Sequence, residues 1–382
     1  MTRKYSKIKN ESDHQQILGY REYSPVWRPW SKYALLSYLV SPIVAHLEGR
    51  PTTRFSNEGI ALAWAQVLNQ LGYEVEIIDW DDKTFKPDRK YDLVVAHGGK
   101  NFEYLRKVLG SGYKLIYFST GTYWRFGNAA EDKRLTDLKR RRRVTLPHDR
   151  YVHDSEESAN RSAGGIIIMG NQFTRSTYNK FPLVISLNNA NFPDDHFDTV
   201  KKNYAEARNN WLFFAGAGNV HKGLDLVIEA FKDLNQNLYI ITLPEKKFLS
   251  AYKNELKLPN IHFIGEVPMR TDRFYEIVDK CAFQIFPSCS EGQPGSVVEA
   301  MNQGLIPILS RESGLDADKY GVILRENTVD CIKETVRQMS AQEPSRVEAM
   351  AKKVRKIALK DHNPEKFRKD LKKAVSKILK SR

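Results

Sequence analysis

The sequence has few cysteines and no long apolar run. Three cysteines, Cys281, Cys289 and Cys331, form no CxxC pair and match neither a disulfide framework nor a zinc site. The longest uncharged stretch, residues 33–47, has 15 residues and contains Pro42, whereas a membrane-spanning helix needs about 20 apolar residues. We expect this stretch to form a buried strand and its exit loop. No apolar segment follows the charged N-terminus, so we expect no secretory signal and a cytoplasmic protein.

Glycine and proline are also scarce, with 22 and 16 residues in the chain, which excludes a fibrous or low-complexity protein. The composition, 41% hydrophobic and 28% charged, is that of an ordinary globular protein. A mean hydropathy of −0.52 argues against a polytopic membrane protein. At roughly 150 residues per domain, the 382 residues predict two domains with separate cores.

The positive charge is concentrated at one end of the chain. The net charge is +14, and residues 345–382 alone hold 14 basic and 4 acidic residues. Their apolar residues recur at helical spacing and predict two amphipathic helices, separated at Asn363 and Pro364. A second basic run, KRRRR at residues 139–143, is expected in a loop or at a helix end. Such segments can bind anionic lipid or another polyanion, or remain solvated; nucleic acid is not expected, because no nucleic-acid-binding module is present.

Short apolar runs alternate with amphipathic segments from Trp211 onward, as in a parallel sheet covered by helices on both faces. The strands predicted in this half cover residues 211–218, 238–243, 261–266, 282–288 and 305–310. The first half is less regular, but it also predicts strands, at residues 73–79, 91–99, 114–121 and 164–171. We therefore predict two Rossmann-like α/β domains, joined within residues 181–210.

The segment SCSEGQPGSVVEAM, residues 288–301, carries the clearest chemical pattern. It joins a predicted strand to a helix that we expect to begin near Pro294. Unpaired amides at a helix N-terminus attract phosphate, and here they would belong to Gly295, Ser296 and Val297. Glu299 would lie one turn into the helix, where it can accept hydrogen bonds from a ribose. Glu291 would precede the helix, at the mouth of the crevice.

The segment GAGNVHKGLD, residues 216–225, follows the first strand of the second domain. Lys222 is a mobile positive charge suited to a diphosphate, and Gly218 is one of the glycines that let the backbone approach a ligand closely. His221 is a further donor-side candidate, although a histidine there can equally be an exposed side chain without a role. Because parallel strands end at one edge of a sheet, both segments are expected at the same crevice.

These segments, together with IHFIGEVP at residues 261–268, resemble the nucleotide-sugar half of the retaining GT-B-fold glycosyltransferases of the group-one superfamily. The resemblance spans about residues 211–325 and is weaker over residues 55–125. It implies two facing Rossmann-like domains with a cleft between them, and final helices that cross back to the first domain. On that basis residues 1–200 are the expected acceptor domain, with residues 361–382 packed against it, and residues 201–360 the expected donor domain.

The resemblance also implies roles for single residues. Lys222 matches the lysine that binds the diphosphate, Glu291 the residue that contacts the donor sugar, and Glu299 the ribose ligand. The family commonly has an arginine five residues before the lysine, where this chain has Ala217. Either another basic residue supplies that charge, or donor binding rests more on Lys222 and the helix N-terminus.

Acceptor-side candidates lie at the strand ends of the first half. His97 ends a predicted strand beside two glycines and is the main catalytic candidate there, against the alternative of a histidine that caps a loop. Thr120 and Trp124 follow the next predicted strand and are candidates to line the acceptor site. The DxD patterns at residues 79–81 and 316–318 are expected to be accidental, and we predict neither a metal nor another cofactor.

The expected function is that of a cytoplasmic glycosyltransferase. A variant of this hypothesis places the protein at the inner face of a membrane, as a peripheral protein. It would move a hexose from a nucleoside diphosphate sugar to a hydroxyl of a glycan or a lipid-linked saccharide, with retention and without a metal. Two alternatives stay open. One is a nucleotide-sugar epimerase or hydrolase on the same fold, and the other is a non-catalytic protein that binds a polyanion through its basic segments.

Overall fold

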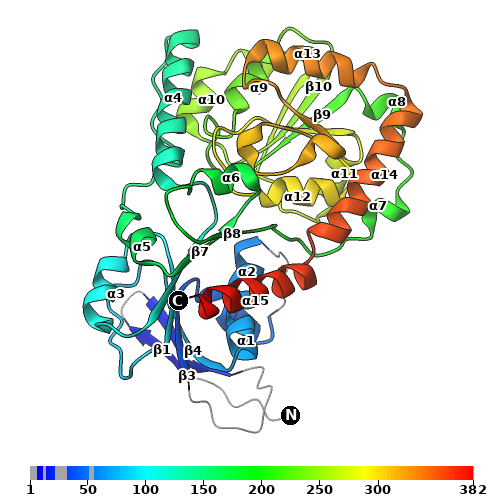
Figure 1. Ribbon diagram of the computed structural model, residues 1–382. Helices are drawn as coiled ribbons and strands as arrows, with labels where there is room; N and C mark the ends of the chain where they lie inside the picture. Colours follow the sequence, from blue (N-terminus) through cyan, green and yellow to red (C-terminus); the bar gives the residue numbers. More distant parts are fainter. Residues whose placement is uncertain (1–6, 12–13, 22–31, 51–55, 382) are drawn as a thin grey trace.

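The computed structural model describes residues 7–11, 14–21, 32–50 and 56–381. These residues form two α/β units, each built on one sheet with helices packed against it (Figure 1). The predicted fold class of two Rossmann-like domains is confirmed. None of the helices in the described ranges is long and apolar enough to cross a membrane.

The first sheet has eight strands in the order β1-β2-β4-β3-β5-β6-β7-β8, and all except the β1–β2 hairpin run parallel. The strands are β1 (Lys7–Glu11), β2 (His14–Tyr20), β3 (Lys32–Tyr38), β4 (Tyr73–Asp79), β5 (Leu93–His97), β6 (Lys114–Ser119), β7 (Gly165–Met169) and β8 (Val184–Leu187). The helices of this half are α1 (Ser41–Leu47), α2 (Ser56–Gln70), α3 (Phe102–Leu109), α4 (Trp124–Arg142), α5 (Glu157–Ser162) and α6 (Gln172–Ser176).

The second sheet has six parallel strands in the order β11-β10-β9-β12-β13-β14. They are β9 (Asn210–Phe214), β10 (Asn237–Ile241), β11 (Ile261–Gly265), β12 (Phe283–Phe286), β13 (Ile306–Leu309) and β14 (Val322–Ile323). The helices are α7 (His196–Thr199), α8 (Tyr204–Ala207), α9 (Leu224–Phe231), α10 (Lys246–Ala251), α11 (Asp272–Val278), α12 (Gly295–Asn302), α13 (Val329–Ser340), α14 (Pro344–Asp361) and α15 (Pro364–Lys380).

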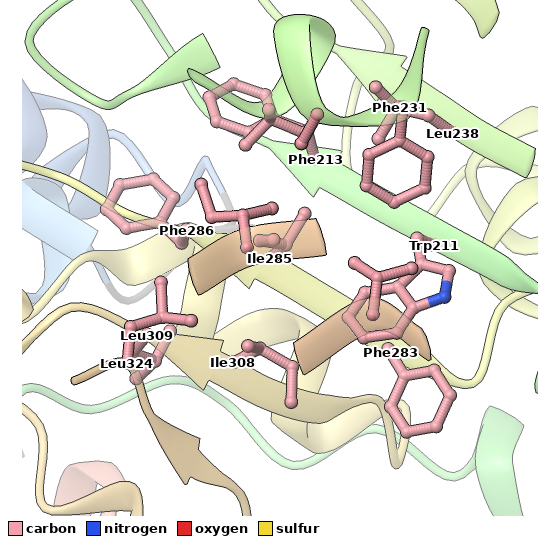
Figure 2. Close-up of a cluster of buried hydrophobic side chains, with 14 of the residues drawn as sticks. Trp211, Phe213, Phe231, Leu238, Phe283, Ile285, Phe286, Ile308, Leu309 and Leu324 are labelled. Carbon is pink, nitrogen blue, oxygen red and sulfur yellow. The ribbon is translucent and has the colours of Figure 1, made fainter. Parts of the chain in front are cut away.

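The core of the second unit shows why its strands could be recognised as continuous apolar runs. Every residue of β12 and β13 is buried, because helices cover both faces of a parallel sheet. Trp211 stacks on Phe283 with 4.4 Å between ring centroids, and aliphatic side chains of the neighbouring strands fill the space around them (Figure 2).

The last two helices confirm the predicted break at Asn363 and Pro364. The Asn363 side chain accepts a hydrogen bond of 2.9 Å from the Lys366 amide and caps α15, which begins with Pro364. Helix α15 leaves the second unit and lies against α2 and β8 of the first (Figure 1). Its buried stripe, which includes Phe367 and Leu371, belongs to the core of the first sheet.

Helix α4 passes from the first unit to the second, in the opposite direction to α15. It comes from the first half of the sequence, but Leu138 is part of the core of the second unit, and the helix runs along that unit in Figure 1. The KRRRR run ends this helix, as one of the two expectations had it. Arg141 forms ion pairs with Asp225 and Glu229, and Arg142 forms one with Glu255, so these two arginines hold the two units together.

One expectation about local structure was wrong, and one element was not anticipated. Residues 41–47, expected as the exit loop of a strand, form α1, because Pro42 occupies the first turn of a helix, where it is tolerated. The β1–β2 hairpin was not anticipated. It adds to the edge of the first sheet through antiparallel pairing of β2 with β4.

Candidate active site

A cavity of about 870 Å³ lies between the two units, at the carboxyl edges of both sheets. The first half contributes Asn57, Ile60, Thr120, Arg150, Met169 and residues 189–191. The second half contributes residues 214–216, Lys222, residues 241–243, residues 266–270, Glu291 and residues 293–296. Among the predicted site residues, this lining includes Lys222, Glu291, Gly295, Ser296 and Thr120.

Lys222 offers a free positive charge to the cavity. Its backbone is fixed by a turn in which the Lys222 amide donates to the Gly218 carbonyl at 2.9 Å. Within the described part of the chain, the ammonium group forms no hydrogen bond or ion pair. Burial lowers the pKa of Lys222, and the nearby carboxylate of Glu291 opposes that effect. A partly desolvated cation of this kind favours an anionic ligand.

The N-terminus of α12 adds hydrogen-bond donors. Pro294 precedes the helix in an extended conformation, and no side chain caps it. The amides of Gly295 and Ser296 have no acceptor in the described residues, whereas the Val297 amide donates to the Pro294 carbonyl at 3.1 Å. Two of the three predicted amides are therefore available at the cavity wall.

Glu291 lies at the boundary between the two units. Its amide donates to the Glu312 carbonyl at 2.9 Å, and its carboxylate accepts a long hydrogen bond of 3.4 Å from Ser288. The chain can approach the first unit this closely because the next residue is Gly292: a Cβ there would lie 2.2 Å from the Thr120 carbonyl oxygen. The structure thus brings Glu291 and Thr120 to the same cavity from opposite sides.

Glu299 is fully buried and does not line the cavity. Arg270 donates to both of its carboxylate oxygens, at 3.1 and 3.0 Å, and Asn191 donates to one of them. Burial raises the pKa of Glu299 and Arg270 opposes that shift. Arg270, which has a φ of +62°, lies at the cavity wall in its place.

His221 and Gly218 lie beside the cavity lining and bind other parts of the protein. The buried His221 ring contacts the Ser290 carbonyl at 2.6 Å, and its other nitrogen lies 3.8 Å from the Glu131 carboxylate. The Gly218 amide donates to the Glu245 carboxylate at 2.7 Å. These contacts shape the loop that carries Lys222.

His97 and Trp124 also lie outside the lining. The Nδ1 atom of His97 lies 2.9 Å from the Phe118 carbonyl oxygen, so in the neutral ring this nitrogen carries the proton and Nε2 is left as the acceptor. Burial lowers the pKa of His97 and favours that neutral form. Trp124 begins α4 and packs beside Tyr123 and Arg125.

Arg150, Asn191 and Arg270 are among the polar residues of this site that were not predicted. Arg270 follows β11, so the rule that ligands bind beyond the ends of parallel strands could have indicated it. Arg150 and Asn191 lie in irregular segments, where no spacing rule applies.

The described residues contain no group of three or more His, Cys, Asp or Glu side chains that could hold a metal ion. Asp194 and His196, two polar residues of the connection between the units, have other partners. Asp194 accepts hydrogen bonds from Tyr275 at 2.6 Å and Gln303 at 2.9 Å, and His196 pairs with Asp279 at 2.9 Å.

Residues 196–377 match the family model described as Glycosyl transferases group 1. Just under half of the chain is thus similar to that family. An uncharacterized glycosyltransferase of Methanocaldococcus jannaschii is 29% identical over 148 residues, which are 37% of this chain and 42% of the relative. The matched region thus spans less than half of that relative.

Solved structures show that the group 1 segment belongs to a GT-B fold. Sucrose-phosphate synthase from Thermosynechococcus elongatus matches 91% of this chain and 99% of its own, with a TM-score of 0.61 and 13% identity. HepE of Anabaena, in complex with UDP and glucose, matches the same shares with a TM-score of 0.54 and 12% identity. At such low identities the likeness concerns the fold.

Proposed function

We propose that this chain is a glycosyltransferase that moves a hexose from a nucleoside diphosphate sugar to a hydroxyl acceptor, with retention of anomeric configuration. The proposal rests mainly on one observation: Lys222 and the free amides of Gly295 and Ser296 meet in a cavity between two Rossmann-like units. A volume of about 870 Å³ is within the range of small-ligand sites. The family assignment and the UDP and glucose bound to HepE support a nucleotide-sugar donor.

The proposed mechanism is electrostatic. Negative charge builds on the diphosphate as the bond to the sugar breaks. Lys222 and the two amides therefore stabilise the transition state more than they stabilise the bound donor before the reaction. Glu291 lies at the same wall and orients the sugar. In this proposal the protein supplies the positive charge and no divalent ion is required. Activity that is lost in EDTA and restored by Mg²⁺ or Mn²⁺ would contradict that last point.

The acceptor is proposed to bind on the side of Thr120. His97 ends the strand next to the one that Thr120 follows, so both residues lie at the same edge of the first sheet. The acceptor is proposed to be a glycan or a lipid-linked saccharide, and His97, with Nε2 as acceptor, is proposed to act on its hydroxyl proton.

We also propose that the chain binds an anionic membrane surface through α15. One exposed face of this helix carries a shallow groove of about 570 Å³. The groove is lined by Lys369, Lys372, Lys373, Ser376, Lys377 and Lys380. The opposite stripe of the helix is buried against α2, so the lysines are held on a fixed face.

Calorimetric titration with UDP, GDP and ADP tests the donor site. We expect micromolar affinity for one nucleotide, weakened tenfold or more by Lys222→Ala, which is about 1.4 kcal/mol. The control is Lys247→Ala, because Lys247 is exposed on α10 and does not line the cavity. A folded wild-type protein that binds none of the three nucleotides would overturn the proposal. Sugar release without an acceptor would instead favour a hydrolase.

A further inference from the structure

Three cations line the cavity among the described residues: Lys222, Arg270 and Arg150. Arg270 is engaged, since its guanidinium pairs with Glu299 at 3.0 Å and lies 3.6 Å from Asp194. The guanidinium of Arg150 has neither a hydrogen bond nor an ion pair to any described residue. Arg150 therefore resembles Lys222: both present to the same cavity a positive charge that forms no ion pair with a described residue.

Arg150 lies across the loop that carries Lys222. A Cβ atom built on Gly218 would lie only 2.8 Å from Cγ of Arg150, so the arginine stem passes directly over this glycine. Arg150 and Lys222 are also close enough for the charge of Arg150 to contribute to the lowered pKa of Lys222, after the effect of burial. The two like charges repel each other, and an anion bound between them would relieve that repulsion.

The backbone at Arg150 is firmly held. The buried Glu131 of α4 accepts hydrogen bonds from the amides of Asp149, at 2.6 Å, and Arg150, at 2.9 Å. Asp149 accepts a third hydrogen bond, of 3.3 Å, from the Val220 amide in the Lys222 loop. The segment that presents Arg150 is thus tied both to α4 and to the loop it crosses, and its position is built into the fold.

We propose that Arg150 supplies the second positive charge that binds the diphosphate of the donor, an assignment that rests on the proposed function. Position 217, before Gly218, is an alanine and contributes no charge. Arg150 provides it from the first half of the chain. The phosphate site is therefore shared between the two halves of the sequence, with Lys222 from the second and Arg150 from the first.

The test is calorimetry with UDP, GDP and ADP on the full chain, comparing wild type, Lys222→Ala, Arg150→Gln and Arg150→Lys. We expect Arg150→Gln to weaken the affinity for the preferred diphosphate about tenfold and Arg150→Lys to restore most of it. Affinity for the corresponding nucleoside, measured by NMR titration, should not change, because the nucleoside carries no phosphate. Arg140→Gln is the matched control, since Arg140 is exposed on α4 and outside the cavity lining.

Arg150→Gln should also unfold at the wild-type temperature, because its guanidinium has no partner to lose. The inference is overturned if Arg150→Gln binds the diphosphate as wild type does while Lys222→Ala weakens binding. It is equally overturned if diphosphate and nucleoside affinities fall together. If the wild type binds no nucleotide, the proposed function itself fails, and the assignment of Arg150 fails with it.

Discussion

The arginines at the end of α4 and the cations of the cavity have the same charge but opposite surroundings. Arg141 and Arg142 are matched by carboxylates of the second unit, as is Arg134 about two turns earlier in the helix. Lys222 and Arg150 have no such partners in the described residues. The first group holds the two units together, and the second is available to a ligand.

This difference cannot be seen in the sequence, where KRRRR is the more conspicuous feature. A polyanion-binding role for that run is weakened because Arg141 and Arg142 are already neutralised by buried or half-buried carboxylates. A positive charge points to a ligand only where the fold leaves it unpaired.

The largest expected effect is on stability, when a carboxylate that pairs with the arginines of α4 is removed. Asp225 is fully buried on α9, accepts a hydrogen bond from Arg141 and lies 3.8 Å from Arg134. Asp225→Ala removes the carboxylate that faces Arg134 and one of the two that pair with Arg141, and we expect it to lower the free energy of unfolding by about 3–5 kcal/mol. Urea unfolding followed by circular dichroism measures this change.

Asp233→Ala is the control for that experiment. Asp233 pairs with Lys333 at the surface and is half exposed, so its loss should cost at most about 1 kcal/mol. If both variants lowered the free energy of unfolding by the same amount, burial would not make the Asp225 ion pairs more important for stability than the surface pair of Asp233.

The next effect concerns the lysines of α15, which resemble the cavity cations in being largely unpaired. A triple variant, with Lys372, Lys373 and Lys377 each changed to Gln, should lose up to about 3 kcal/mol of binding to anionic membranes, or about 1 kcal/mol for each lysine. Cosedimentation with phosphatidylcholine vesicles, with and without phosphatidylglycerol, measures the loss.

The control changes three exposed lysines of the second unit, Lys232, Lys247 and Lys257, to Gln. It should keep wild-type binding to the anionic vesicles. Neither triple variant should change nucleotide affinity, because none of these lysines lines the cavity. If phosphatidylglycerol did not increase the binding of the wild-type protein to the vesicles, the proposed membrane surface would be refuted.

Much of the fold was predictable because its strands are buried on both faces. Such strands appear in a sequence as short apolar runs between turns, and β4 has the bounds that were predicted for it. The β1–β2 hairpin could not be predicted in this way, since it lies at an edge and its segments, KIKNE and HQQILGY, are mostly polar. The long helix α4 was also missed, because its packing surface is made largely by ion pairs with the other unit.

The site was predictable where it depends on a single strand–loop–helix unit. Lys222, Gly295 and Ser296 each follow a strand of the second sheet and line the cavity. Arg150 could not be found, because its position depends on the packing of two units that are far apart in the sequence. The burial of Glu299 was missed for the same reason: its partner Arg270 comes from a different loop.

The smallest effect extends the comparison to carboxylates. Asp149 forms no ion pair with a lysine or arginine of the described residues, in contrast to Asp225. Burial, with the nearby charge of Glu245, raises the pKa of Asp149 from 3.8 to about 6. As the pH rises, Asp149 therefore loses its proton at a lower pH in the unfolded chain than in the folded protein. This difference favours the unfolded chain, so the free energy of unfolding falls between about pH 4 and pH 6.

Asp149→Asn removes this penalty and keeps an oxygen to accept the hydrogen bond from Val220. The variant should match the wild type near pH 4 and exceed it above pH 6, by about 1 kcal/mol or less because the carboxyl group is partly exposed. Thermal unfolding of both proteins across this pH range gives the difference, with the exposed Asp318→Asn as the control for losing one negative charge. A difference that stays constant with pH, or grows toward low pH, would mean that Asp149 is compensated in the folded protein after all, and that the distinction between paired and unpaired groups does not extend to the acids of this loop.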